Sequence, residues 1–295
     1  MADLSVLRAQ EYSTNLELLS QQMTPKLAPY ATVQSGVGSK ALRMVSQVAE
    51  TDGIAYTTRA TPAMNLDVGL DGRWVYPQFF AWGTVVDDVE ALQTNIAPQG
   101  AYVRTAVAYM NRKKDDLFIN AFFGTSQTGE TGGTAVTFPA AQQVAVTVGT
   151  GAATGLNVEK LRAGKRLLLE ADVDLDMEQI YCAVSPLQHD NLLALTQVVS
   201  TDFNDRPVLV DGMVRQFLGI NFVISNRLPT DSNSYRRNPM WVPSGMGCGE
   251  WQAIQGTIRT RPDLQFDPDY VEAKMGAGFT RLEEAKCVEI KSSEV

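Results

Sequence analysis

The run from Arg73 to Gly124 constrains the fold of this chain more than any other segment. Its first half, RWVYPQFFAWGTVVDD, is rich in aromatic and β-branched residues. Trp74, Tyr76, Phe80 and Trp82 fall on the same parity, so they are predicted to share one face of an extended strand. An aromatic face of this size requires a partner, and these four residues are therefore the candidates for contact between subunits.

The second half of the run, PQGAYVRTAVAYMNRKKDDLFINAFFG, predicts one long helix. Pro98 stands where a first helical turn tolerates it, and Gly124 stands where a left-handed C-cap is favoured. About 25 residues lie between these marks, which corresponds to roughly 39 Å of helix. A helix of this length beside a projecting aromatic arm indicates an assembling subunit rather than a self-contained enzyme.

Composition is consistent with one or two soluble domains. The chain has 295 residues, of which 44% are hydrophobic and 20% are charged, so it can bury a substantial core. No apolar run approaches the ~20 residues of a membrane helix, and the N-terminus lacks a secretory signal, so we expect cytosolic synthesis and no membrane partner. Cys182, Cys248 and Cys287 form no CxxC motif, and buried free thiols are expected.

The charge pattern argues against a protein that grips nucleic acid by its phosphates. The net charge is −8 and the pI is near 4.8, whereas phosphate binding requires a basic face. Arg112, Lys113 and Lys114 form the dense basic cluster of the sequence, and two aspartates follow it directly. We interpret this cluster as a solvated helix face.

The remaining elements alternate between helix and strand. Periodicity and turn residues predict a helix at 4–23, strands at 41–49, 134–139 and 142–148, a helix at 157–171, a strand at 179–184, a helix at 186–199, strands at 220–225 and 240–243, and a terminal strand or hairpin at 278–293. Residues 50–72 have no clear period, and an irregular connection of this length indicates either disorder or a binding role. We prefer a two-stranded arm that lies on a neighbouring subunit.

Motifs that resemble catalytic or binding loops fail on spacing. GTGAATG at 149–155 places its third glycine one position late for a dinucleotide loop, and GVGSK at 36–40 lacks the spacing of a phosphate loop. Asp172, Asp174 and Asp176 imitate calcium ligands, but Met177 occupies the position that requires glycine. A hinge, a turn and a solvated loop are the respective interpretations.

His189 is the one histidine in the chain, which excludes a histidine-rich metal site. It follows Ser185 and Pro186, which are predicted to begin a helix, so an exposed histidine in the second turn is expected. No serine lies in a GxSxG motif, and the carboxylate pairs have no special context. The sequence therefore predicts no catalytic residue, no cofactor and no metal ligand, and the chain is not expected to be an enzyme.

Three stretches resemble the major capsid proteins of tailed bacteriophages with the Hong Kong 97-type fold. The long helix with the following GETGG resembles that family's spine helix, and YCAVSPLQHDNLLAL resembles the strand and helix of its axial domain. VRQFLGINFVISNRLP resembles the strand that lies beside that one in the family, and this strand usually ends near a Leu-Pro. Together these stretches extend the resemblance over nearly the whole chain.

The resemblance implies an α+β fold with a peripheral domain, a long spine helix, an extended β loop and an α/β axial domain. It divides the chain into an N-terminal arm at 1–40, an extended loop with its β arms at 41–92, a peripheral domain with the spine helix at 93–150, an axial domain at 151–250, and a return to the peripheral domain at 251–295. Such subunits form hexamers and pentamers that close an icosahedral phage head around double-stranded DNA.

The resemblance also implies partners. We expect a separate scaffolding protein, a portal and room for a decoration protein, with DNA enclosed in the virion without sequence-specific binding. No lysine occurs from 41 to 112, so covalent crosslinking from the arm is not expected. A cellular nanocompartment shell of the same fold is the nearer alternative, and an α/β enzyme or binding protein is the more distant one.

Overall fold

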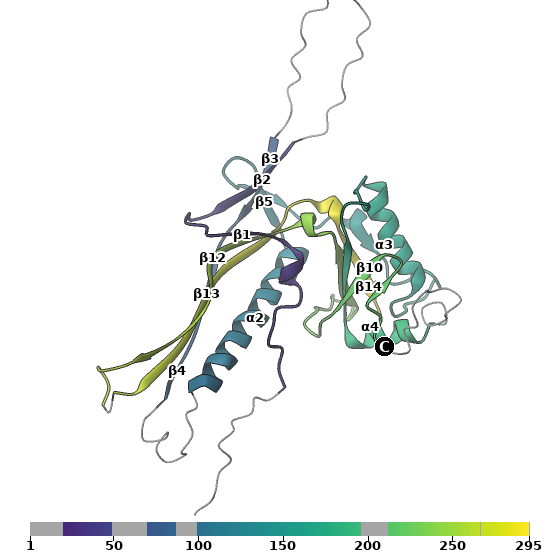
Figure 1. The fold of residues 1–295 in the computed structure, drawn as a ribbon. Coiled ribbons are helices and arrows are strands. Elements are labelled where there is room, and N and C mark those ends of the chain that lie inside the picture. The colour runs from purple at the N-terminus through teal and green to yellow at the C-terminus, as the bar shows by residue number, and fades with distance from the viewer. Residues whose placement is uncertain (1–19, 49–69, 87–98, 196–211, 266, 295) are drawn as a thin grey trace, which may run out of the picture. The chain divides into compact units, whose positions relative to one another are not determined.

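A computed structural model describes residues 20–48, 70–86, 99–195, 212–265 and 267–294 (Figure 1). The chain divides into two compact units. The first combines Met1–Pro25, Gln78–Lys114 and Gln252–Gly276, and the second combines Lys26–Pro77, Asp115–Trp251 and Ala277–Val295. No helix within the described ranges is both long and apolar enough to cross a membrane.

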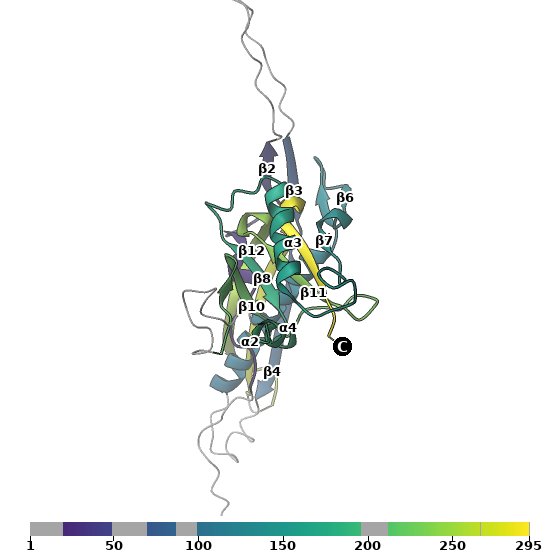
Figure 2. The same cartoon turned by 90° about the vertical axis from the view of Figure 1, so that its right-hand side faces the viewer.

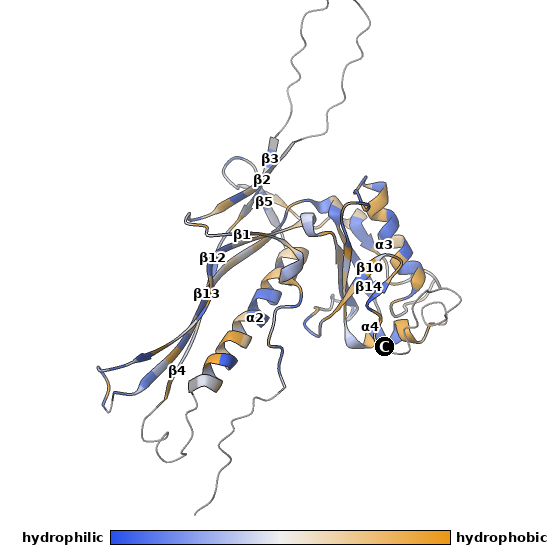
Figure 3. Cartoon of the chain, in the orientation of Figure 1, coloured by the Kyte–Doolittle hydropathy of each residue, from blue (hydrophilic) through white to orange (hydrophobic). Residues whose placement is uncertain are grey.

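The first unit contains β4 (Gln78–Val86), the first part of helix α2 (Gln99–Phe123), and the outer parts of β12 (Met246–Thr260) and β13 (Asp269–Arg281). The strands belong to a four-stranded sheet of order β1-β12-β13-β4, in which β1 is Thr32–Ser35. Arg112 is half-buried here and donates hydrogen bonds to Gln21 and Gln22, so it contributes more than a solvated charge. Hydrophilic and hydrophobic turns alternate along α2 (Figure 3).

The second unit is built around a six-stranded sheet of order β7-β14-β11-β8-β10-β9. Its strands are β7 (Gln143–Val144), β8 (Ile180–Val184), β9 (Gln216–Phe217), β10 (Ile220–Ile224), β11 (Arg236–Trp241) and β14 (Cys287–Ser292). β10 runs parallel to β8, whereas β11 is antiparallel to both β8 and β14. Helix α3 (Val158–Glu170) packs on β14 and β7, and α4 (Pro186–Leu193) follows β8 (Figure 2).

Sequence signals at the helix starts are confirmed. The Asn157 side chain accepts a hydrogen bond from the Lys160 N–H at 2.8 Å and caps α3, and Ser185 caps α4 with Pro186 at the first helical position. Apolar side chains of α3 and α4, among them Leu161 and Leu192, pack with the strand residues in one core. The predicted helix 186–199 is confirmed only as far as Leu193, because residues 194 and 195 are not helical, and residues 196–199 lie outside the described part of the chain.

A smaller sheet of order β2-β3-β5-β6 also lies in the second unit. It contains β2 (Leu42–Val48), β3 (Leu70–Val75), β5 (Ser126–Thr128) and β6 (Thr134–Val136). β2 and β3 pair antiparallel from Leu42↔Val75 to Val48↔Leu70, with an irregularity between Met44 and Ser46. The paired strands are the base of the predicted two-stranded arm, which we call the arm base; residues 49–69 lie outside the described part of the chain, as does nearly all of the predicted helix 4–23.

The long helix is confirmed, but its C-terminal cap is not left-handed. Gly124 is absent from the glycines with positive φ, and its N–H donates to the Asn120 carbonyl at 2.8 Å. A Cβ at Gly124 would lie 2.5 Å from that oxygen. Close approach to the helix therefore explains this glycine, and backbone handedness does not.

The described residues contain four short 3-10 turns, which are η2 (Ala28–Tyr30), η3 (Ala140–Gln142), η5 (Pro243–Gly245) and η6 (Glu284–Lys286). η3 precedes β7, and η6 leads into the last strand, β14. The predicted strand 142–148 shrinks to Gln143–Val144 because turns follow. β14 pairs with β11 and β7, so the end of the predicted return segment 251–295 lies in the six-stranded sheet. The named domain division stays a prediction.

Candidate assembly site

The aromatic run is divided between two strands. β3 ends at Val75 and β4 begins at Gln78, and the two strands belong to different sheets. The prediction that Trp74, Tyr76, Phe80 and Trp82 share one face of one strand is therefore wrong. Pro77 supplies the reason, because it cannot donate a ladder hydrogen bond.

Trp74 and Tyr76 contact the turn between β5 and β6. The Trp74 Nε1–H donates to the Gly129 carbonyl at 2.7 Å, and Trp74 is half-buried. Gly132 has φ of +74°, and a Cβ there would lie 2.5 Å from the Tyr76 hydroxyl and 3.1 Å from the Trp74 ring. Trp74 thus has a partner in its own subunit, whereas Tyr76 stays 48% exposed.

In the first unit, the most exposed aromatic side chain of β4 does not lie on the face that the sequence predicted to be the contact face. Phe80 and Trp82 are half-buried, and Phe79 on the opposite face is 66% exposed. A Cβ at Gly276 would lie 2.6 Å from the Phe79 ring, so glycine at this position leaves space for the ring. The sequence pattern did not point to Phe79, because alternation shows which residues share a face of the strand but not which face other parts of the subunit cover. Contact between subunits through the four candidates stays a prediction.

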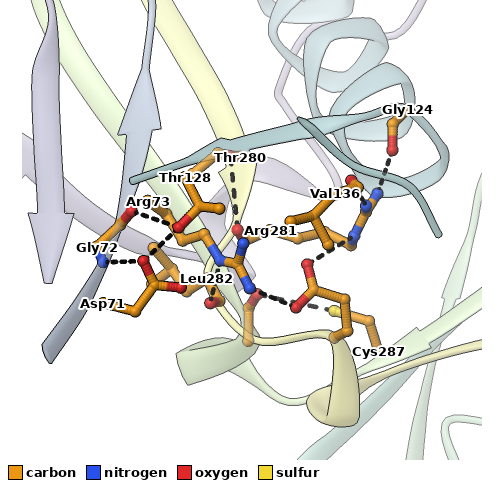
Figure 4. Close-up of polar contacts among 12 residues, drawn as sticks. Asp71, Gly72, Arg73, Gly124, Thr128, Val136, Thr280, Arg281, Leu282 and Cys287 are labelled. Atoms are coloured by element: carbon orange, nitrogen blue, oxygen red, sulfur yellow. Dashed lines mark hydrogen bonds and ion pairs between the residues drawn. The ribbon is translucent and has the colours of Figure 1, made fainter. Parts of the chain in front are cut away.

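A largely buried polar cluster holds the arm base, and Figure 4 labels four of its members, Asp71, Arg73, Thr128 and Arg281. We call Asp71, Arg73, Thr128, Arg281 and Glu284 the arm-base cluster. Arg73 donates from Nε to the Leu282 carbonyl at 3.2 Å and from Nη2 to the Glu284 carboxylate at 2.6 Å. The Thr128 hydroxyl donates to the Asp71 carboxylate, which holds the pKa of Asp71 below its usual value.

Arg281 closes the C-terminus of α2. Its Nη1 donates to the carbonyls of Ala121, Phe122 and Gly124 at 3.2, 2.7 and 2.5 Å, and its Nη2 donates to the Val136 carbonyl at 3.1 Å. The last carbonyls of a helix have no intrahelical donor and carry the negative end of the dipole, so a guanidinium is a suitable cap. The side chain is fully buried, and burial lowers the pKa of Arg281.

One carboxylate lies between the two buried guanidinium groups. Glu284 Oε2 is 2.6 Å from Arg73 Nη2, and Glu284 Oε1 is 3.8 Å from Arg281 Nε. Glu284 belongs to η6, the turn between β13 and β14. The cluster therefore joins β3 of the arm, the end of the long helix and the turn that leads into the last strand.

Asp115 attaches the segment before β1 to the long helix. Its buried carboxylate accepts hydrogen bonds from the backbone N–H groups of Lys26, Leu27 and Ala28, at 2.9 to 3.3 Å for the closest oxygen of each. Leu27 is fully buried in the core cluster that contains Phe118, Phe122 and Trp241. One aspartate in mid-helix thus satisfies three consecutive donors of an adjoining chain segment.

His189 is not exposed as predicted, since only 7% of it is accessible. Its Nε2 accepts a hydrogen bond from the Val214 N–H at 2.9 Å, which requires the neutral imidazole. Burial lowers the pKa of His189, and the charge of Asp190 opposes this effect only in part. The histidine is a structural acceptor that holds the chain before β9.

The described residues contain no group of three or more His, Cys, Asp or Glu side chains arranged to hold a metal ion. The three cysteines are free and buried, as expected, and burial raises the pKa of Cys182 to about 12. A thiol that stays protonated is a poor nucleophile. Asp174 accepts hydrogen bonds from the N–H groups of Asp176 and Met177, which gives an exposed loop.

Comparison with known proteins identifies the class. The family model described as phage capsid protein matches residues 5–294, so the chain belongs to that family. It is a structural protein of a bacteriophage capsid, a component of the virion, and it has the Hong Kong 97-type fold. No curated protein sequence matches the chain.

Solved capsid structures share the fold at low identity. The capsid structure of Cyanophage P-SCSP1u matches with a TM-score of 0.72 and 14% identity over 98% of this chain and 94% of that chain. The capsid asymmetric unit of Cyanophage Pam1 matches with a TM-score of 0.69 and 15% identity over 99% of both chains. Mycobacterium phage Che8 matches with a TM-score of 0.68 and 14% identity over 96% of both. Major capsid protein is the function that the family and these neighbours support.

Proposed function

We propose that copies of this chain form hexamers and pentamers and close into an icosahedral head that encloses double-stranded DNA. The chain acts here as the major shell subunit and performs no catalysis. The observation that carries the proposal is the arm base, a two-stranded ladder held by buried charges in a chain that belongs to the phage capsid family. Buried charges that fix the arm base have a function if the arm contacts a neighbouring copy.

The charge of the chain supports an interior that does not bind DNA tightly. The net charge of −8 gives a wall that repels phosphates weakly, which allows DNA to slide while it is packaged. DNA is therefore enclosed without sequence-specific contact.

Exposed aromatic residues favour contact between copies. Tyr76 and Phe79 are 48% and 66% exposed, and each has a ring that is costly to leave in water. Together with Trp74, Phe80 and Trp82, they are the candidate contact residues of the shell. We assign residues 151–250 to the axial domain and residues 93–150 to the peripheral domain that contains the spine helix.

Further partners follow from the same assignment. A separate scaffolding protein directs assembly. A portal occupies one vertex, a decoration protein binds the finished shell, and the chain is synthesised in the host cytoplasm.

Particles purified from a productive infection test the proposal. We expect this chain to be the most abundant protein of particles that contain nuclease-resistant double-stranded DNA. Particles that contain the chain with a packaged protein cargo and no DNA would contradict the proposal and support a nanocompartment shell instead.

A further inference from the structure

We propose that Arg73 and Glu284 are positioning residues that fix the direction of the arm base, strands β2 and β3, in the isolated subunit, before any neighbour binds. This inference rests on the proposed function, because it concerns the arm that contacts a neighbouring copy. It names the side chains that prepare the arm for that contact.

Both faces of β3 are held by other parts of the second unit. On one face, Arg73 reaches the Leu282 carbonyl and the Glu284 carboxylate, while Val75 packs with Met44 and Leu282 in a small apolar cluster. On the other face, Trp74 donates to Gly129. A strand held on both faces cannot rotate about its axis without breaking one set of contacts.

The ion pair is the most specific of these three side-chain attachments. Arg73 and Glu284 are 2.6 Å apart with both side chains largely shielded from water, so separation would leave an uncompensated buried charge. Apolar packing permits small rotations at little cost, whereas a directed, charge-assisted hydrogen bond does not. This pair therefore adds a directed side-chain constraint on the orientation of β3 to the ladders that join β3 to β2 and β5.

Close packing in the ladder transfers the orientation from β3 to β2. A Cβ at Gly72 would lie 2.2 Å from the Arg43 Nε, so the Arg43 side chain on β2 lies directly over the backbone of β3. The two strands form a continuous antiparallel pair apart from the irregularity between Met44 and Ser46. The arm base thus moves as one body with Arg73.

An arm that is already oriented costs less to dock. Binding has to supply the free energy for ordering flexible segments, and preorganisation removes part of this cost. We expect Arg73→Met and Glu284→Gln each to slow shell assembly by at least about tenfold, which corresponds to about 1.4 kcal/mol. Both variants retain most of the side-chain volume and remove the charge.

The matched control is Glu283→Gln. Glu283 is the neighbouring carboxylate in sequence, and it pairs with Lys286 at 3.0 Å in a more exposed position. We expect this variant to assemble at the wild-type rate. The double variant Arg73→Met with Glu284→Gln leaves neither partner of the pair charged, so it separates stability from positioning.

Two measurements on the same preparations test the inference: hydrogen exchange of the β2 and β3 amides in unassembled subunits, and assembly followed by light scattering. We expect faster exchange and slow assembly in both single variants. The double variant should regain only part of the thermal stability that the single variants lose, because Arg281 still lacks the Glu284 carboxylate, and it should still exchange quickly and assemble slowly.

Wild-type assembly by the double variant would overturn the inference, because the pair would then serve stability alone. Unchanged exchange at the arm base in the single variants would also overturn it. If the wild type forms no shells, the proposed function fails, and exchange in the subunit alone still decides whether Arg73 and Glu284 hold the arm base.

Discussion

Replacing Asp115 with alanine tests how the segment before β1 is attached to the long helix. The substitution removes the one carboxylate that accepts from Lys26, Leu27 and Ala28. Three backbone N–H groups then lose their charged acceptor in a region where water does not easily replace it. We expect the free energy of unfolding to fall by a large amount for a single substitution, because Asp115 is buried.

The magnitude follows from the number of hydrogen bonds. A hydrogen bond to a charged group contributes about 1.5 to 3 kcal/mol, but three donors share one carboxylate here and its burial cost disappears with it. We therefore expect Asp115→Ala to lower the free energy of unfolding of the second unit by about 4 kcal/mol. Asp115→Asn keeps one acceptor oxygen and should cost about half as much.

Chemical denaturation followed by circular dichroism measures this change. Asp116→Asn is the control, because Asp116 pairs with Arg227 in a partly exposed bidentate contact at 2.5 to 2.6 Å. The control should lower stability by about 1 kcal/mol or less. A loss below about 1 kcal/mol in Asp115→Ala would show that the three hydrogen bonds contribute almost nothing to stability, contrary to this prediction.

Three further predictions concern titration and exposed surface. Burial lowers the pKa of Lys160 to about 8, so unfolded chains bind more protons than folded ones between pH 8 and 10.5. The free energy of unfolding should therefore rise across this range in the wild type but not in Lys160→Met. Denaturation at pH 7.5 and 9.5 measures the difference. Because the pKa of His189 is lowered in the folded chain, stability should fall as the pH drops below 6.5. His189→Gln can still accept the hydrogen bond from Val214 and should flatten this pH dependence. A histidine pKa above 6.5 measured by NMR would contradict the prediction. Phe79→Ser should slow assembly while the thermal midpoint of the subunit changes little, and the reverse pattern would place Phe79 in the subunit's own core.

Local signals in the sequence predicted the local structure well. The long helix, the caps at Asn157 and Ser185, and the strands near 180 and 220 follow from periodicity and capping chemistry, which act within a few residues. The aromatic residues do alternate along the run, but Pro77 divides the run between two strands in different sheets. An alternating pattern that crosses a proline therefore indicates two strands rather than one.

The hydrogen bonds that join distant segments could not be predicted, because the residues that form them are far apart in the sequence. Asp115 binds a segment that begins at Lys26, and Arg281 caps a helix that ends at Phe123. Neither residue differs locally from an ordinary surface charge in a helix or strand. His189 shows the same limit, since its acceptor role depends on the N–H of Val214 from another part of the chain.

Assembly of the shell can be observed directly by cryo-electron microscopy of the protein assembled with its scaffolding partner. We expect closed isometric shells in which the β2–β3 arm of each copy lies on a neighbouring copy, with Arg73 still paired to Glu284 at the arm base. Monomers or small oligomers under conditions that preserve the fold, or shells in which the arm packs on its own subunit, would contradict it.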